Sequence, residues 1–134
     1  SSVPWPFHYL PSFTDFLERV RQCLSPGGDF VFSVEHPIFT AAGPQEWYYG
    51  PDGTPLHFPV DRYFEEGRRT ARFLGEDVTK YHRTLTTYLD DPAYRGFSLR
   101  RVVEPKPPQR MMDLPGMKDE LRRPMMLLVA AVKQ

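Results

Sequence analysis

The sequence is poor in cysteine, since Cys23 is the only one among 134 residues. One cysteine cannot form an internal disulfide, and such usage is compatible with a reducing cytosol. The four histidines are scattered along the chain and lack the close spacing of a zinc site. We therefore expect a cytoplasmic protein without an internal disulfide and without a bound metal.

Net charge is lacking as well, because 17 lysines and arginines balance 17 aspartates and glutamates. No excess of positive charge draws the chain as a whole toward nucleic acid or anionic lipid. The arginine pairs at 68–69, 100–101 and 122–123 are well separated and are predicted to be solvated flanks of helices and strands. We expect no nucleic-acid partner.

Long apolar runs are also missing. The longest, residues 125–132, is far shorter than the roughly 20 residues that a membrane-spanning helix needs. The first residues show no charged region followed by an apolar stretch, as a secretion signal would. We expect no membrane partner.

Proline and aromatic residues are abundant: the chain has 15 prolines, and 14% of its residues are aromatic. Most prolines fall between segments with a regular hydrophobic period, so irregular connections must surround a small core. Since the composition shows no break, we expect a single domain over residues 1–134.

Two elements are predicted near the beginning of the chain. Ser12 is a suitable N-cap, and apolar residues then recur at helical spacing, which predicts an amphipathic helix over residues 12–24. Pro26, Gly27 and Gly28 end this helix. Residues 30–34 form a nearly continuous apolar run of β-formers, which predicts a strand covered on both faces.

Residues 38–76 interrupt this regular pattern. The segment holds prolines, glycines and many aromatic residues without a clear period, so we predict an aromatic-rich insertion. A long insertion in a compact domain is usually functional or disordered, which favours a lid over a substrate. The alternative is an aromatic hairpin that packs on its neighbours.

The rest of the chain predicts a second helix and two more strands. Helical spacing returns from Val78 to Leu89, and Gly96 offers a stop. Strands are predicted at residues 97–103 and 125–132, and the loop at 111–123 is expected to contain one helical turn at 118–121. Helices that alternate with buried strands indicate an α/β layered structure.

Four stretches resemble class I S-adenosylmethionine-dependent methyltransferases. Residues 8–11 (HYLP) before a helix and residues 21–28 (RQCLSPGG) before a strand resemble motifs in the second half of that family. Residues 34–41 (VEHPIFTA) and 80–89 (KYHRTLTTYL) are similar to a subgroup that acts on small molecules. The resemblance implies that the chain corresponds to the family's carboxyl-terminal portion. Its three strands would then form part of a Rossmann-like sheet, with the last strand antiparallel between the other two.

One hallmark of the family is missing from this sequence. The family binds S-adenosylmethionine mainly through a glycine-rich turn after its first strand and an acidic residue at the end of its second. None of the nine glycines here forms a G-x-G motif. Such a turn lets the backbone approach the ligand, so we expect the chain alone to bind the cofactor poorly and to be inactive.

Candidate catalytic residues follow from strand ends and from the resemblance. Glu35 and His36 stand where the first strand should end, and ligands collect beyond the carboxyl ends of strands in open α/β sheets. Either could accept a proton from a substrate, or both could simply end the strand. His82 is a third candidate, predicted to share a helix face with Thr86, although a structural histidine is the common alternative.

Cofactor and substrate contacts are implied as well. The resemblance places His8 and Tyr9 on the side of the cofactor's methionine part and the substrate, whereas an apolar arm of the chain is the alternative. If the insertion is a lid, its aromatic residues would select an organic acceptor. The substrate-binding candidates are Trp47, Tyr49, His57 and Tyr63, together with Tyr81 beside His82.

Two functions are therefore open: the substrate side of a small-molecule methyltransferase, or a non-catalytic binding or assembly module with the same fold. Part of the sheet of the full family fold would be missing in either case. We predict a homodimer, or association with a chain that supplies the missing amino-terminal half, through residues 29–36 and the first helix.

Overall fold

The computed structural model describes residues 10–134, and a three-stranded sheet lies at its centre. The strands β1 (Asp29–Glu35), β6 (Phe97–Val103) and β7 (Met126–Lys133) have the order β1-β7-β6. β7 is antiparallel to both neighbours, so β1 and β6 are parallel to each other. The α/β class and the antiparallel middle strand are confirmed.

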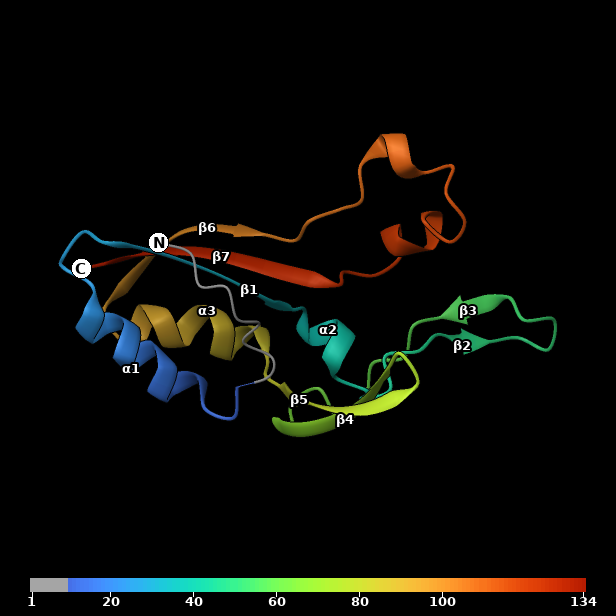
Figure 1. Cartoon of the computed structure of the whole chain (residues 1–134), viewed down its shortest axis with the longest axis horizontal. Helices are drawn as coiled ribbons and strands as arrows, with labels where there is room; N and C mark the ends of the chain where they lie inside the picture. The colour runs from blue at the N-terminus through green and yellow to red at the C-terminus, as the bar shows by residue number, and fades with distance from the viewer. Residues whose placement is uncertain (1–9) are drawn as a thin grey trace.

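Two helices, α1 (Phe13–Cys23) and α3 (Leu85–Tyr94), lie on the same side of this sheet (Figure 1). Ser12 caps α1 as predicted, because its hydroxyl accepts a hydrogen bond of 3.3 Å from the Asp15 amide. The buried core between the helices and the sheet consists of Phe13, Leu17, Phe30, Phe32, Val34, Tyr88, Phe97, Leu127, Val129 and Ala131.

The turn between α1 and β1 needs its two glycines. Gly27 has φ +86°, which a residue with a side chain rarely adopts. A Cβ atom on Gly28 would lie 2.9 Å from the Ser25 carbonyl oxygen. The Gly27 amide donates to the carbonyl of Lys133 at 2.7 Å, so the turn is joined to the end of β7.

The predicted insertion folds into short elements. These are α2 (Pro37–Thr40), β2 (Tyr48–Tyr49), β3 (Pro55–His57) and β4 (Gly67–Phe73). β2 pairs with β3, and β4 pairs with β5 (Glu76–His82), both antiparallel. Figure 1 shows the β2–β3 hairpin extending away from the end of the central sheet.

The prediction of a helix beginning near Val78 is wrong. Val78 and Tyr81 lie on β5, and α3 begins only at Leu85. Leu74 (φ 53°) and Gly75 (φ 83°) form a two-residue turn with positive φ at both positions, which favours a hairpin. The seven paired residues on each strand outweigh a helical spacing that rested on only two positions before Leu85.

The segment from residue 104 to residue 125, hereafter the 104–125 loop, connects β6 to β7. It contains two short 3₁₀ helices, η2 (Gln109–Met111) and η3 (Lys118–Leu121). The predicted helical turn at 118–121 is thus present. The guanidinium of Arg122 donates to the carbonyls of Pro55 (3.0 Å) and Leu56 (2.9 Å), which joins this loop to β3.

Candidate active site

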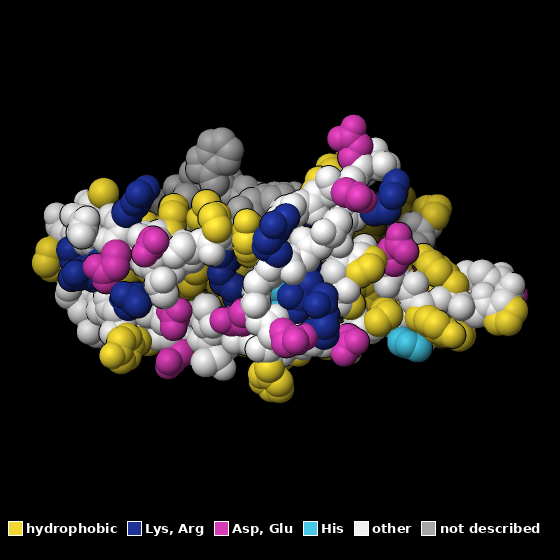
Figure 2. Space-filling model, turned by 90° about the horizontal axis from the view of Figure 1, so that it is seen from below, with side chains coloured by type: hydrophobic (Ala, Val, Ile, Leu, Met, Phe, Trp, Pro, Cys, Tyr) yellow, Lys and Arg dark blue, Asp and Glu magenta, His cyan; other side chains and the backbone are white. Residues whose placement is uncertain are grey.

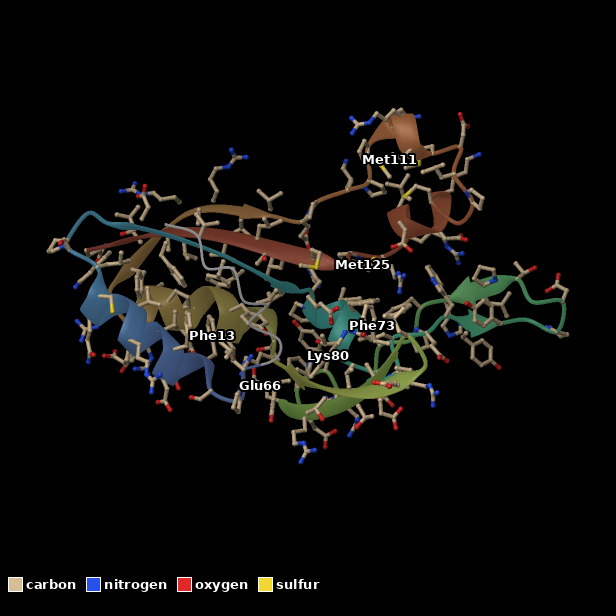
Figure 3. All side chains as sticks on the ribbon, viewed as in Figure 1. Phe13, Glu66, Phe73, Lys80, Met111 and Met125 are labelled. Carbon is tan, nitrogen blue, oxygen red and sulfur yellow. The ribbon has the colours of Figure 1, made fainter. Side chains whose placement is uncertain are left out.

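Glu35 lies at the end of β1, as predicted, and is the centre of a buried polar network. The Lys80 ammonium lies 2.8 Å from one of its carboxylate oxygens and 2.9 Å from the other. The Gln45 side chain donates to Glu35 at 2.7 Å and accepts from Lys80 at 2.7 Å. Figure 3 shows Lys80 beneath α2, where β5 meets the end of β1. The network therefore holds the insertion against the sheet.

His36 follows β1 and caps α2. Its Nδ1 atom accepts the Ile38 amide at 3.1 Å, and its Nε2 atom lies 2.5 Å from a carboxylate oxygen of Glu104. Since Nδ1 is an acceptor, Nε2 must be the donor to Glu104. Both ring nitrogens are engaged, so in this arrangement His36 positions the backbone and the 104–125 loop. A role as a base stays a prediction.

His82 is the last residue of β5, so the prediction that it shares a helix face with Thr86 is wrong. Its Nε2 atom lies 2.7 Å from the Tyr63 carbonyl oxygen, to which it donates, and Nδ1 lies 2.7 Å from the Thr40 hydroxyl. Burial lowers the pKa of His82, and the bond to the Tyr63 carbonyl opposes that effect only in part. The neutral ring therefore links β5 to α2 and to residue 63.

Tyr63 and Glu66 hold the start of α3. The Tyr63 hydroxyl accepts the Leu85 amide at 3.0 Å. One carboxylate oxygen of Glu66 accepts from the amide (2.9 Å) and hydroxyl (3.2 Å) of Thr84 and from the Thr87 hydroxyl (2.5 Å). Burial opposes ionisation of Glu66, but these hydrogen bonds outweigh it and lower its pKa. Glu66 therefore stays charged.

A cavity of about 290 Å³ opens beside these residues, near the start of α1. Its walls are residues 11–14, 66–67 and 81–83, with Thr87 and Asp91 from α3. Figure 3 shows Glu66 near Phe13 at this end of α1. Burial raises the pKa of Asp91, although Arg95 opposes the effect. A partly buried carboxyl group at a cavity wall is a candidate proton acceptor.

The sequence singled out Tyr81 and His82 but missed Glu66, Thr87 and Asp91 as members of this site. Thr87 and Asp91 are four residues apart, so they could have been placed on one helix face. Nothing in the sequence indicated that this helix face contacts Glu66. The chain between Glu66 and Thr87 contains β5, which was predicted as part of a helix.

A second cavity, of about 350 Å³, lies under the β2–β3 hairpin. Trp47, His57 and Phe58 contribute to its walls together with Arg122 and Arg123 of the 104–125 loop. Tyr49 is exposed on the hairpin, where hydrophobic side chains gather at the right of Figure 2. The structure thus divides the predicted substrate residues, with Trp47 and His57 at this cavity and Tyr81 at the first.

Two arginines differ from the prediction of solvated flanks. Arg69 is 5% exposed and donates to the carbonyls of Ala41 (2.8 Å), Arg62 (2.9 Å) and Glu65 (2.7 Å). The side chain of Arg123 is 9% exposed and lies against aromatic rings. The sequence of an arginine pair does not show which of its two side chains is buried. Arg68, Arg100 and Arg101 are exposed, as expected.

The described residues do not form the cofactor cradle of a methyltransferase. His36 and Pro37 follow β1, and Glu104 and Pro105 follow β6, so neither strand leads into a glycine-rich turn. The predicted cofactor contacts His8 and Tyr9 lie outside the described residues. Between residues 10 and 134, no three His, Cys, Asp or Glu side chains are grouped to hold a metal ion. No helix in this part of the chain has the length and apolar character to cross a membrane.

Comparisons with known proteins relate the chain to methyltransferases. The crystal structure of a Listeria monocytogenes protein assigned as an S-adenosylmethionine-dependent methyltransferase superimposes with a TM-score of 0.91 and 54% identity. The whole of this chain aligns with 60% of the Listeria protein. An S-adenosylmethionine-dependent methyltransferase from Mesorhizobium loti gives a TM-score of 0.82 and 40% identity, with 99% of this chain matched to 60% of that one.

A further relative also matches this chain over only part of its own length. An uncharacterised protein of Haemophilus influenzae is 29% identical over 128 residues, which are 95% of this chain and 50% of the relative. No family model matches the chain. The chain thus spans only about half to three fifths of the proteins it resembles.

The chain has part of the methyltransferase fold. The full coverage of this chain, with partial coverage of both solved structures, confirms the predicted resemblance to the carboxyl-terminal portion of class I S-adenosylmethionine-dependent methyltransferases.

Proposed function

We propose that the chain forms the acceptor side of an S-adenosylmethionine-dependent methyltransferase that acts on a small molecule. The observation that carries this proposal is the 54% identity and TM-score of 0.91 with the Listeria protein along the whole chain. The match covers the whole chain, including the residues that line both cavities. The cofactor that these relatives imply is S-adenosylmethionine.

The first cavity is the proposed acceptor site. Its wall includes Pro11, two positions after Tyr9 in the sequence, and the resemblance places His8 and Tyr9 beside the cofactor. Tyr81 would contact the acceptor, and the Asp91 carboxylate would accept a proton from it, since burial raises the pKa of Asp91 and makes it a stronger base. Glu35 and His36 would hold the neighbouring segments in position, since they do not line this cavity. His82 lies at its wall, with its ring nitrogens bound to the Thr40 hydroxyl and the Tyr63 carbonyl.

The cofactor proposal is tested by calorimetric titration with S-adenosylmethionine. For this chain alone we expect no binding tighter than about millimolar, because the glycine-rich turn is missing. The chain joined to the part of the Listeria protein that it does not cover should bind in the micromolar range. Failure of the joined protein to bind would contradict the proposal. Micromolar binding by the chain alone would contradict its expected inactivity.

The alternative is a binding or assembly module without catalysis. It is supported by the hydrogen bonds of His36 and His82, which occupy both nitrogens of each ring. In either case we propose that residues 29–36 and α1 contact a second copy or a chain that completes the fold. A cytoplasmic location is proposed from the single cysteine.

A further inference from the structure

We infer that the acceptor cavity takes an amine, which it binds as the ammonium cation through the carboxylates of Glu66 and Asp91. The inference rests on the proposed function, because it names the class of acceptor for the cavity assigned to that role. Three observations carry it: the net charge of the cavity wall, an unoccupied carboxylate oxygen on Glu66 and the position of Asp91 on α3.

The wall of this cavity carries more negative than positive charge. Glu66 and Asp91 are its carboxylates, and Arg83 is its only guanidinium in the described part of the chain. Arg83 is 6% exposed and donates a hydrogen bond to the carbonyl of Leu10. His82 adds no charge, because burial lowers its pKa. The wall therefore attracts a cation and repels an anion.

Glu66 has a carboxylate oxygen that the fold does not use. Its Oε2 atom accepts all three hydrogen bonds from Thr84 and Thr87. Its Oε1 atom accepts none from residues 10–134. Burial opposes ionisation, but the hydrogen bonds lower the pKa of Glu66. Because Glu66 lines the cavity, a charged acceptor is available to a ligand there.

Asp91 lies where the fold gains little from a carboxylate. It is in the last turn of α3, where the helix dipole disfavours negative charge. Its carboxylate receives no hydrogen bond from residues 10–134, and burial raises its pKa. Arg95 opposes that effect, but the negative charge of Glu66 adds to it. The two carboxylates thus repel each other, and an ammonium bound by both would relieve the repulsion.

The two carboxylates belong to the same part of the cavity. Thr87 and Asp91 are one helical turn apart on α3, and the Thr87 hydroxyl donates to Glu66 at 2.5 Å. Phe13 and Tyr81 also line the cavity and offer apolar surface to the carbon chain of an amine. In the proposed reaction one N–H proton of the ammonium passes to a carboxylate oxygen of Asp91, which leaves the nitrogen with a free lone pair.

Propylamine is the probe for this site, since an aliphatic amine is charged at neutral pH. The uncharged match is n-propanol, and propionate is the anion that the start of α1 alone would favour. Binding is followed without cofactor through the amide NMR signals of Gly67 and Thr87, at an ionic strength held constant with sodium chloride. We expect propylamine to bind with a dissociation constant of about 10 mM or below, and the other two to give no saturable shift up to about 100 mM.

Two variants test the carboxylates. Asp91→Asn removes the charge at constant side-chain length and should weaken propylamine binding about tenfold. It should not lower the thermal midpoint, because the charge it removes is unfavourable at this end of α3. Glu66→Gln keeps an acceptor for Thr84 and Thr87 and should weaken binding about threefold. Asp90→Asn is the matched control, since Asp90 is exposed on α3 and does not line the cavity.

Equal binding of propylamine and n-propanol would overturn the inference, as would unchanged propylamine binding by Asp91→Asn. Stronger binding of propionate would overturn it in favour of an acidic acceptor. No saturable shift with propylamine up to about 100 mM would overturn it too. If Glu66→Gln fails to fold, the Asp91→Asn comparison still decides. The S-adenosylmethionine titration is a separate measurement, so cofactor binding by the joined protein without amine binding here would exclude only the amine class.

Discussion

The Lys80 ammonium on β5 contacts both carboxylate oxygens of Glu35 at the end of β1, at 2.8 and 2.9 Å. The two side chains are 5% and 14% exposed. Two residues 45 positions apart thus form a buried ion pair that attaches the β4–β5 hairpin to the central sheet. The loss of either partner removes the opposite charge from the one that stays buried.

Lys80→Met should lower the free energy of unfolding by about 3 kcal/mol, because the Glu35 carboxylate loses its cation. The double variant Lys80→Met with Glu35→Leu should be less destabilised than Lys80→Met alone. Urea denaturation measures both. Arg72→Met is the control, since its pair with Asp77 at 3.7 Å is exposed and contributes about 0.5 kcal/mol or less. A loss in Lys80→Met no larger than that of the control would contradict the prediction.

Stability should fall in mildly acidic solution because of His82. Burial lowers the pKa of His82 in the folded protein, so the unfolded chain binds the proton more readily. The contribution is complete above about pH 6.5 and is lost as the pH falls from there through the folded-state pKa. Between pH 7.5 and pH 5.5 this one group accounts for a loss of at most about 1.4 kcal/mol.

Unfolding experiments at the two pH values test this effect. His82→Gln should show a smaller acid loss than the unmodified chain, whereas His57→Gln, at an exposed position, should retain the full loss. The same pH dependence in both variants would show that other groups are responsible.

The turn of the β4–β5 hairpin should accept a stabilising substitution. Leu74 has φ 53° and is 88% exposed, so a bulky residue occupies a left-handed conformation without packing in return. Leu74→Asn should raise the thermal midpoint by a few degrees, corresponding to about 0.5–1 kcal/mol. Gly75→Ala should lower it, because Gly75 has φ 83°. Calorimetry that ranks the two variants in the opposite order would refute this reading of the turn.

Amide hydrogen exchange should divide the insertion into two parts. The two-residue and three-residue strands of the β2–β3 hairpin should exchange fastest, since few ladder bonds protect them. The β4–β5 hairpin should exchange more slowly, and Val31 and Val129 of the central sheet more slowly still. Protection of residues 38–76 equal to that of Val31 and Val129 would contradict the predicted substrate lid and favour a structural role for the insertion.

The proposed assembly should depend on β1, which is an outer strand of the sheet within residues 10–134. Val31 is 38% exposed on this strand. Val31→Lys, and more strongly its combination with Phe16→Ala, should dissociate the homodimer in sedimentation experiments. Val31→Lys alone is the cleaner test, because Phe16 also packs on Phe30 within the chain. Val102→Lys on β6 is the control, and a compact monomer at high micromolar concentration would exclude the dimer.

Local patterns were enough to predict most of the central layer. Three predictions relied only on neighbouring residues: the helix after Ser12, the strand at 30–34 and the strand at 125–132. All three elements are present. The order of the strands came from the resemblance rather than from periodicity. The β4–β5 hairpin was missed because the turn at Leu74 and Gly75 lacks the usual asparagine, and because Val78 and Tyr81 fit a helical spacing by coincidence.

Patterns of neighbouring residues were sufficient to predict α1 and the three strands of the sheet, and to place Glu35 and His36 at the end of β1. Which charges are buried together depends on contacts between segments that are far apart in the chain. Glu35 meets Lys80, His36 meets Glu104, and Arg123 meets Phe39, Trp47 and Phe58 across 45, 68 and at least 65 residues of chain. Hydrophobic periodicity shows which side chains leave water, because it acts between near neighbours. Partners of buried charges lie on distant segments, and only the packing of the insertion and the 104–125 loop brings them together.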